Sequence, residues 1–188
     1  MRPSPSDLYA ETRDLVAEAV STFGVHATVD TALALLDGST DYERLVVPLT
    51  YLGGASAYRH LERGDLAHRN QGHWPRVWAA RSFLYVWLDY AAPTVTAGLQ
   101  DEHWRVRETC VKVVAARHID LSTDALLACI HDPEPRVQIA ALRAAATVGD
   151  ERHRMLAEGL TSEDLPREVS IAALSAERSL RRRKVSDG

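Results

Sequence analysis

Residues 132–150 read DPEPRVQIAALRAAATVGD, and 31 residues earlier the chain reads DEHWRVRETCVKVVAAR. Both stretches begin with an aspartate, reach an Arg-Val pair and continue in small apolar residues at helical spacing. Such spacing is typical of an amphipathic helix with one buried face. The match between two separate stretches raises the question of whether one structural unit has been copied along the chain.

Four valines mark successive copies of this stretch. They stand 29, 31 and 32 residues apart, at Val77, Val106, Val137 and Val169. An aspartate lies five positions before three of them, as Asp101, Asp132 and Asp164. Small residues follow three or four positions after each valine, which allows another helix to approach closely.

The segments between these runs also have helical composition. They cover residues 89–100, 122–131 and 151–160. Pro135 and Pro166 fall where the second helix of a pair would start, a position that tolerates proline because its missing N–H would be unpaired anyway. The repeating unit is therefore a helix pair of about 30 residues, a period that is typical of a solenoid.

The N-terminal part also reads as helical, without a clear repeat. Residues 7–23 and 27–37 each form a helical pattern that ends at a glycine. A third segment, residues 41–64, contains Pro48 and the pair Gly53-Gly54. Proline removes a helix hydrogen bond and glycine weakens a helix, so we expect a kink or break in this segment.

The repeated pattern resembles the HEAT repeat, particularly the short bacterial variety that is also found in phycobilin lyases. The residues that carry the resemblance are Asp101, Val106 and Arg107 in one copy, and Asp132, Val137, Ala140, Ala141 and Leu142 in the next. Gln138 replaces the arginine in the second of these copies, so the Asp–Arg ladder that is typical of the family is incomplete. The resemblance implies an all-α fold, a right-handed α-solenoid of stacked antiparallel helix pairs.

We expect one all-α domain over residues 1–188, a length that suits a single domain. Within it, residues 1–70 would form N-terminal helices and residues 74–180 the HEAT-like repeats. Residues 181–188 form a basic tail that we expect to fray into solvent. The resemblance is closest over residues 101–150.

A stripe of aromatic side chains with one arginine is the candidate binding surface. The resemblance implies that second helices line a concave face, and we place the positions one, four, five and eight after each valine on one side of those helices. Tryptophan and tyrosine would supply stacking faces, and an arginine would hold a carboxylate, sulfate or phosphate. The candidate residues are Tyr51, Tyr58, Trp74, Trp78, Arg81, Tyr85 and Arg107.

The expected pocket lies where residues 48–62 meet residues 74–88. A structural alternative stays open for the same residues. The aromatic side chains would then cover the junction with the N-terminal helices, while Arg81 would pair with Glu62 or Asp89. Aromatic stripes on helices are more often part of a core than of a site.

Catalytic and metal-binding motifs give no support for a specific reaction. None of the eight histidines lies three or four residues from another, and no His-Glu-x-x-His, Gly-x-Ser-x-Gly or phosphate-binding glycine loop occurs. We therefore expect no metal and no cofactor. Cys110 and Cys129 are expected to be reduced thiols in the core.

Three functions fit the sequence, in descending order. The first is a scaffold or accessory subunit that binds another protein, as a homo- or hetero-oligomer. The second is a ligand-binding or catalytic subunit of a heteromeric enzyme that acts on a small anionic metabolite. The third is a DNA-binding protein similar to alkylation-repair glycosylases with HEAT-like repeats, which the net charge of −4 disfavours. The sequence leaves open whether any reaction is catalysed.

The cytoplasm is the expected location. No apolar run follows the start MRPSPSDLYAE, and no apolar stretch is long enough to cross a bilayer. Only Lys112 and Lys184 among the 22 basic residues are lysines, and this bias toward arginine favours a GC-rich bacterial source.

Overall fold

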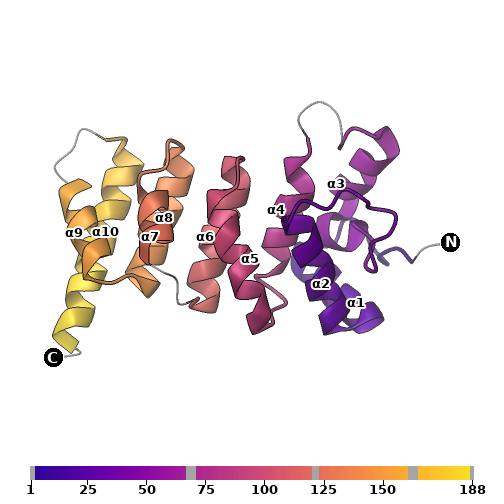
Figure 1. Cartoon of the computed structure of the whole chain (residues 1–188), viewed down its shortest axis with the longest axis horizontal. Coiled ribbons are helices and arrows are strands. Elements are labelled where there is room, and N and C mark those ends of the chain that lie inside the picture. Colours follow the sequence, from indigo (N-terminus) through magenta and orange to yellow (C-terminus); the bar gives the residue numbers. More distant parts are fainter. Residues whose placement is uncertain (1–2, 67–70, 120–122, 161–164, 187–188) are drawn as a thin grey trace. The chain divides into compact units, whose positions relative to one another are not determined.

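The computed structural model describes residues 3–66, 71–119, 123–160 and 165–186, and every regular element in these ranges is a helix (Figure 1). This confirms the all-α prediction. The chain forms two compact units, Met1–Val95 and Thr96–Gly188. The single domain that the sequence suggests stays a prediction.

In its described residues, the first unit holds four complete α-helices, a short 3₁₀ turn and the start of α5 (Ala92–Ala97). The complete elements are α1 (Thr12–Phe23), α2 (Val25–Leu36), α3 (Thr50–Arg63), α4 (His73–Ser82) and η1 (Asp89–Ala91). Helix α2 packs on α4, and α1 packs on α3. The core between them is closed by fully buried side chains that include Leu35, Leu52 and Phe83.

Helix α1 starts later than residues 7–23 predict. Ser6 donates hydrogen bonds from its backbone N–H and its hydroxyl to the Glu18 carboxylate, at 2.9 Å each. This contact folds the N-terminal segment back along α1, and the helix begins only at Thr12.

The predicted break in the third segment is confirmed at Gly54. This residue has φ 53° and ψ −142°, which interrupts α3. A Cβ atom at Gly54 would lie 2.7 Å from the Leu8 carbonyl oxygen. Both the positive φ and this close carbonyl therefore require glycine here. Pro48 lies just before α3, where it needs no helix hydrogen bond.

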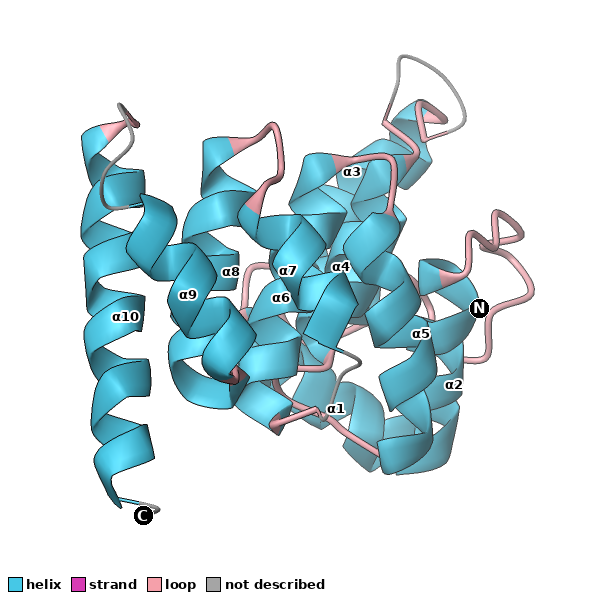
Figure 2. Ribbon diagram, turned by 60° about the vertical axis from the view of Figure 1, so that its left-hand side comes forward, coloured by secondary structure: helices cyan, strands magenta, loops and turns pink. Residues whose placement is uncertain are grey.

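The second unit contains the copied helix pairs. Its elements are the end of α5 (Ala92–Ala97), η2 (Gly98–Gln100), α6 (Trp104–Arg117), α7 (Thr123–Ile130), α8 (Pro135–Val148), α9 (Glu151–Leu160) and α10 (Arg167–Ser186). The second helices pack in chain order, α6 on α8 and α8 on α10, while α7 packs on α8 and α9 on α10 (Figure 2). Val106, Val137 and Val169 are all 0% exposed, which confirms the shared apolar seam.

Local signals in the second unit agree with the sequence. Pro135 occupies the first turn of α8, as expected. The Asp150 carboxylate accepts hydrogen bonds from the backbone N–H groups of Arg152 and His153 and so caps α9. Ser122, which could cap α7, lies outside the described residues.

The basic tail at residues 181–188 begins as part of α10, and its fraying stays a prediction. It continues α10 as far as Ser186, and residues 187–188 lie outside the described ranges. The Arg183 guanidinium donates hydrogen bonds to the carbonyl oxygens of Thr147, Ala145 and Gly149 at the end of α8. The Ala145 carbonyl also accepts the Gly149 N–H, which ends α8. The last carbonyls of a helix otherwise lack donors within it, so Arg183 caps the end of α8 and ties α10 to it.

Both cysteines are free and buried, as predicted.

Across the described residues, no single helix has the length and apolar character to span a bilayer. Helices α1 and α2 meet that criterion only when they are taken together, and they are bent by 120° relative to each other.

Candidate functional site

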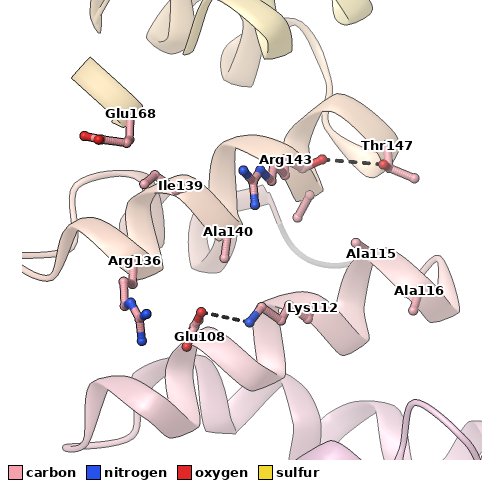
Figure 3. Close-up of a pocket in the computed structure, with 11 residues that line it drawn as sticks. Glu108, Lys112, Ala115, Ala116, Arg136, Ile139, Ala140, Arg143, Thr147 and Glu168 are labelled. Carbon is pink, nitrogen blue, oxygen red and sulfur yellow. Dashed lines mark hydrogen bonds and ion pairs between the residues drawn. The ribbon is translucent and has the colours of Figure 1, made fainter. Parts of the chain in front are cut away.

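A groove of about 840 Å³ lies along the second helices of the second unit (Figure 3). Helix α6 contributes Glu108, Lys112, Ala115 and Ala116; α8 contributes Arg136, Ile139, Ala140, Arg143, Ala144 and Thr147; and α10 contributes Glu168. The groove therefore belongs to the repeated part of the chain.

Small side chains form the floor of the groove. Ala140 and Ala144 are 7% and 1% exposed, and Ala115 on α6 is half-buried. Alanine at these positions leaves space above the helix surface, while Ile139 adds a larger apolar side chain. The floor can therefore receive apolar side chains from a ligand or partner.

Charged side chains surround this floor unevenly. Lys112 Nζ lies 2.8 Å from Glu108 Oε1, so these two charges largely neutralise each other. Arg136 and Arg143 are both exposed and stand two helical turns apart on α8. In the described part of the chain, neither of their guanidinium groups forms an ion pair with a carboxylate. The groove thus offers two cations to a ligand.

An aromatic ring holds Arg136 at one end of the groove. The Arg136 and Arg105 guanidinium carbons lie 5.6 and 4.3 Å from the centroid of the Trp104 ring. Stacking of this kind contributes about 0.5–1 kcal/mol at an exposed site and limits the rotamers of the arginine. Arg136 is therefore partly ordered before anything binds.

Most of the positions that the sequence places together on one side of α6 and α8 are buried in the structure. At four, five and eight residues after the valine, Cys110, Val111 and Val114 on α6 are 0% exposed. The groove instead uses positions such as two and six residues after the valine, which place Glu108 and Lys112 on the opposite side of the helix. The difference between the predicted side and the open side has a physical reason. A second helix contacts the neighbouring second helices and its own first helix, so most of its surface is buried.

Two of the predicted aromatic residues belong to the core of the first unit. Tyr51 is 2% exposed and meets Phe23 edge to face at 5.2 Å between ring centroids, and burial raises the pKa of its hydroxyl. Trp78 is also 2% exposed, and a Cβ atom on Gly53 would lie 2.6 Å from its ring. The indole therefore occupies the space that the expected pocket would need beside Gly53.

The other predicted aromatic residues are closer to solvent. The Trp74 ring stacks on Trp78 with centroids 6.1 Å apart, and its Nε1 donates a hydrogen bond to Gln71 Oε1. Tyr58 and Tyr85 are 45% and 42% exposed. The stripe is thus half core and half surface.

Among the predicted site residues, Arg81 has a half-buried guanidinium whose charge is not paired with a carboxylate of the described residues. It lies in the last turn of α4, where a cation complements the helix dipole. Its Nε is buried without a hydrogen-bond partner, and burial lowers the pKa of the guanidinium. Within the described residues, no ion pair joins it to Glu62 or Asp89, so that alternative does not account for it.

The Arg107 guanidinium is hydrogen-bonded to other residues of the protein. Its Nε and Nη2 donate to the two carboxylate oxygens of Asp132 at 2.6 and 2.8 Å, and its Nη1 donates to the carbonyls of Asp101 and Glu102. This pair is one rung of the expected Asp–Arg ladder. It joins α6 to the turn before α8 and leaves Arg107 little capacity for a ligand.

Comparison with protein-family models matches residues 92–176 to HEAT repeats. The matched range includes every residue that lines the groove. No curated protein matches the chain.

Proposed function

Because residues 92–176 belong to the HEAT-repeat family, we propose that this helical-repeat scaffold binds another protein in the groove along α6 and α8. The observation that carries the proposal is the pair Arg136 and Arg143. Both are exposed beside an alanine floor, and neither forms an ion pair with a carboxylate of the described residues. Arginine is enriched among the residues that dominate binding energy at protein interfaces.

The groove is large enough to hold a short segment of a partner but too small to form a complete protein interface. Its volume of about 840 Å³ accommodates a few side chains. A stable complex usually buries about 1,200–2,000 Å² in total, so the partner would also contact surface beside the groove. The inserted segment would carry small or medium apolar side chains together with carboxylates that pair bidentately with Arg136 and Arg143.

Site-specific cross-linking in cells of the source organism tests this proposal. A photo-reactive residue in place of Thr147, at the edge of the groove, should cross-link a defined protein. The same residue in place of Thr22, which is exposed on α1, should not. The double variant R136E/R143E should reduce the Thr147 adduct about tenfold or more, because two charge-assisted contacts become repulsive.

A matched variant controls for the change in net charge. R13E/R44E reverses two exposed arginines of the first unit and should leave the Thr147 adduct intact. Equal loss with both double variants would contradict the proposal, as would an adduct that does not respond to R136E/R143E.

Arg81 supports a second candidate function, the binding of a small anion. A half-buried guanidinium with an unpaired Nε costs free energy in the unbound protein, and a carboxylate, sulfate or phosphate would offset that cost. Tyr85 lies near enough to interact with the guanidinium electrostatically and is 42% exposed, so it could contact the same anion.

Thermal unfolding distinguishes an anion site from a structural arginine. If Arg81 waits for an anion, R81M should be as stable as the original protein or more stable, because an unpaired buried charge is removed. Sulfate or phosphate should then raise the Tm of the original protein more than that of R81M. A large loss of stability in R81M without any anion would reject this candidate.

A further inference from the structure

The outer face of α10 carries exposed apolar side chains. Ile171 and Leu174 are 56% and 42% exposed and lie close together on the helix. They line a shallow hollow of about 450 Å³ with Ser175, Arg178, Ser179 and Arg182. Every lining residue comes from α10 itself, so the hollow lies along one face of this helix.

This face is opposite to the face that holds α10 in the fold. Val169, Ala173 and Ala176 are 0–1% exposed, on the side where α10 packs on α8 and α9. At 100° per residue, Ile171, Leu174 and Arg178 lie on the other side. A helix side that no neighbouring helix covers is expected to be polar. Among the described residues no helix covers this side of α10, so two large apolar residues depart from that pattern.

Among the residues that the structure describes, the charged side chains along this face are all arginines. Reading along α10, the outward row is Arg167, Ile171, Leu174, Arg178 and Arg182. The nearby glutamates turn aside: Glu168 lines the groove, and Glu177 pairs with Arg181 at 3.0 Å. The face is thus an apolar centre with cations at both ends.

This charge pattern disfavours a second copy of the same chain. Two α10 helices that met antiparallel through Leu174 would set Arg178 against Ile171 and Arg167 against Arg182 of the other copy. A parallel pair would set each arginine against its own equivalent. Both arrangements bring guanidinium groups together at an apolar contact, which is destabilising.

We infer that the outer face of α10 binds an amphipathic helix of a partner protein, whose apolar centre has carboxylates on both sides. The partner's apolar residues cover Ile171 and Leu174, and its carboxylates meet Arg167 and Arg178. The docked helix lies along α10 as a further helix of the stack. This site uses none of the groove residues, so it does not depend on the function proposed for the groove.

A designed peptide tests the inference with the full chain. The probe is a fluorescein-labelled, alanine-rich helical peptide with two leucines on one face and glutamates one turn beyond them on each side. The control peptide has lysine at each glutamate position. Fluorescence anisotropy should give micromolar binding of the acidic peptide, and the basic peptide should bind about tenfold or more weakly.

Variants of α10 decide whether the peptide binds this face. L174S and R178E change exposed side chains and should leave the Tm nearly unchanged, while each weakens the acidic peptide about tenfold. R136E/R143E in the groove should leave peptide binding unchanged. Equal binding of both peptides, or binding that is lost in R136E/R143E but kept in L174S and R178E, overturns the inference. Concentration-dependent dimerisation that L174S abolishes would also overturn it, in favour of a second copy.

Discussion

Arg107 and Asp132 link the second helix of one pair to the turn before the second helix of the next. Their side chains are only 14% and 6% exposed. Hydrogen bonding to Asp132 raises the pKa of Arg107 above its ordinary value. The contact belongs to stability rather than to binding, although the sequence alone suggests a binding role for Arg107.

R107A should therefore destabilise the protein by about 2–4 kcal/mol, because Asp132 would remain as a poorly solvated carboxylate without its partner. K112A removes one member of the more exposed Lys112–Glu108 pair and should cost at most about 1 kcal/mol. Urea unfolding of both variants measures the difference. Similar small losses in both would show that the Arg107–Asp132 pair does not stabilise the repeat junction.

Cys129 gives a prediction that depends on pH. Burial raises the pKa of its thiol to about 11. The folded state therefore favours the protonated thiol, and this contribution to stability is complete below pH 9, where the unfolded thiol titrates, and declines as the pH rises toward 11. The native protein should react with a thiol reagent at pH 8 only as fast as it unfolds. Rapid modification of Cys129 without unfolding would contradict the burial of this side chain.

At the scale of elements, Gly54 decides how the first unit closes. The break in α3 lets Ala55 donate a hydrogen bond to the Leu8 carbonyl at 2.7 Å, which ties the N-terminal segment to α3. A regular helix through this position would lack that contact. The backbone conformation and the close carbonyl both exclude a side chain here.

G54A should cost about 3 kcal/mol or more, because it adds both backbone strain and a steric contact. G64A is a matched control: Gly64 also has positive φ, at the end of α3, but a Cβ atom there would meet nothing within 4 Å. We expect G64A to cost only about 1 kcal/mol. Equal Tm values for the two variants would mean that the contact with Leu8 does not constrain α3.

The sequence predicts where helices begin and end better than it predicts which side of each helix is exposed. Val106 and Val137 could be aligned because a buried β-branched residue recurs at the same point of every pair, and the break near Gly54 follows from glycine chemistry. The groove could not be located in this way. Which side of α6 stays open depends on how the neighbouring helices pack. In addition, alanine occurs both at the bottom of a groove and between packed helices, so its position in the sequence does not distinguish the two. Glu108 and Lys112 could have been found as the polar positions opposite the buried Cys110 and Val114.

At the scale of the molecule, the two units carry different kinds of candidate site. The first unit offers one half-buried arginine, Arg81, beside an aromatic core. The second offers a groove and an outer helix face, each with arginines around small or apolar residues. The charges are local, since the whole chain has a net charge of −4. Local cations on an acidic chain favour partners with a defined arrangement of carboxylates over polyanions.

Duplex DNA should therefore bind weakly if at all. A DNA-binding face neutralises several phosphates at once, and its affinity falls steeply with added salt. In the groove, Lys112 is already paired with Glu108, and Glu168 adds a further negative charge beside Arg136 and Arg143. A labelled duplex of about 20 base pairs should show no anisotropy change at micromolar protein, even at low salt, where non-specific binding is strongest. Tight binding that weakens as salt rises, and that R136E/R143E removes while R13E/R44E does not, would assign the groove to nucleic acid instead of protein.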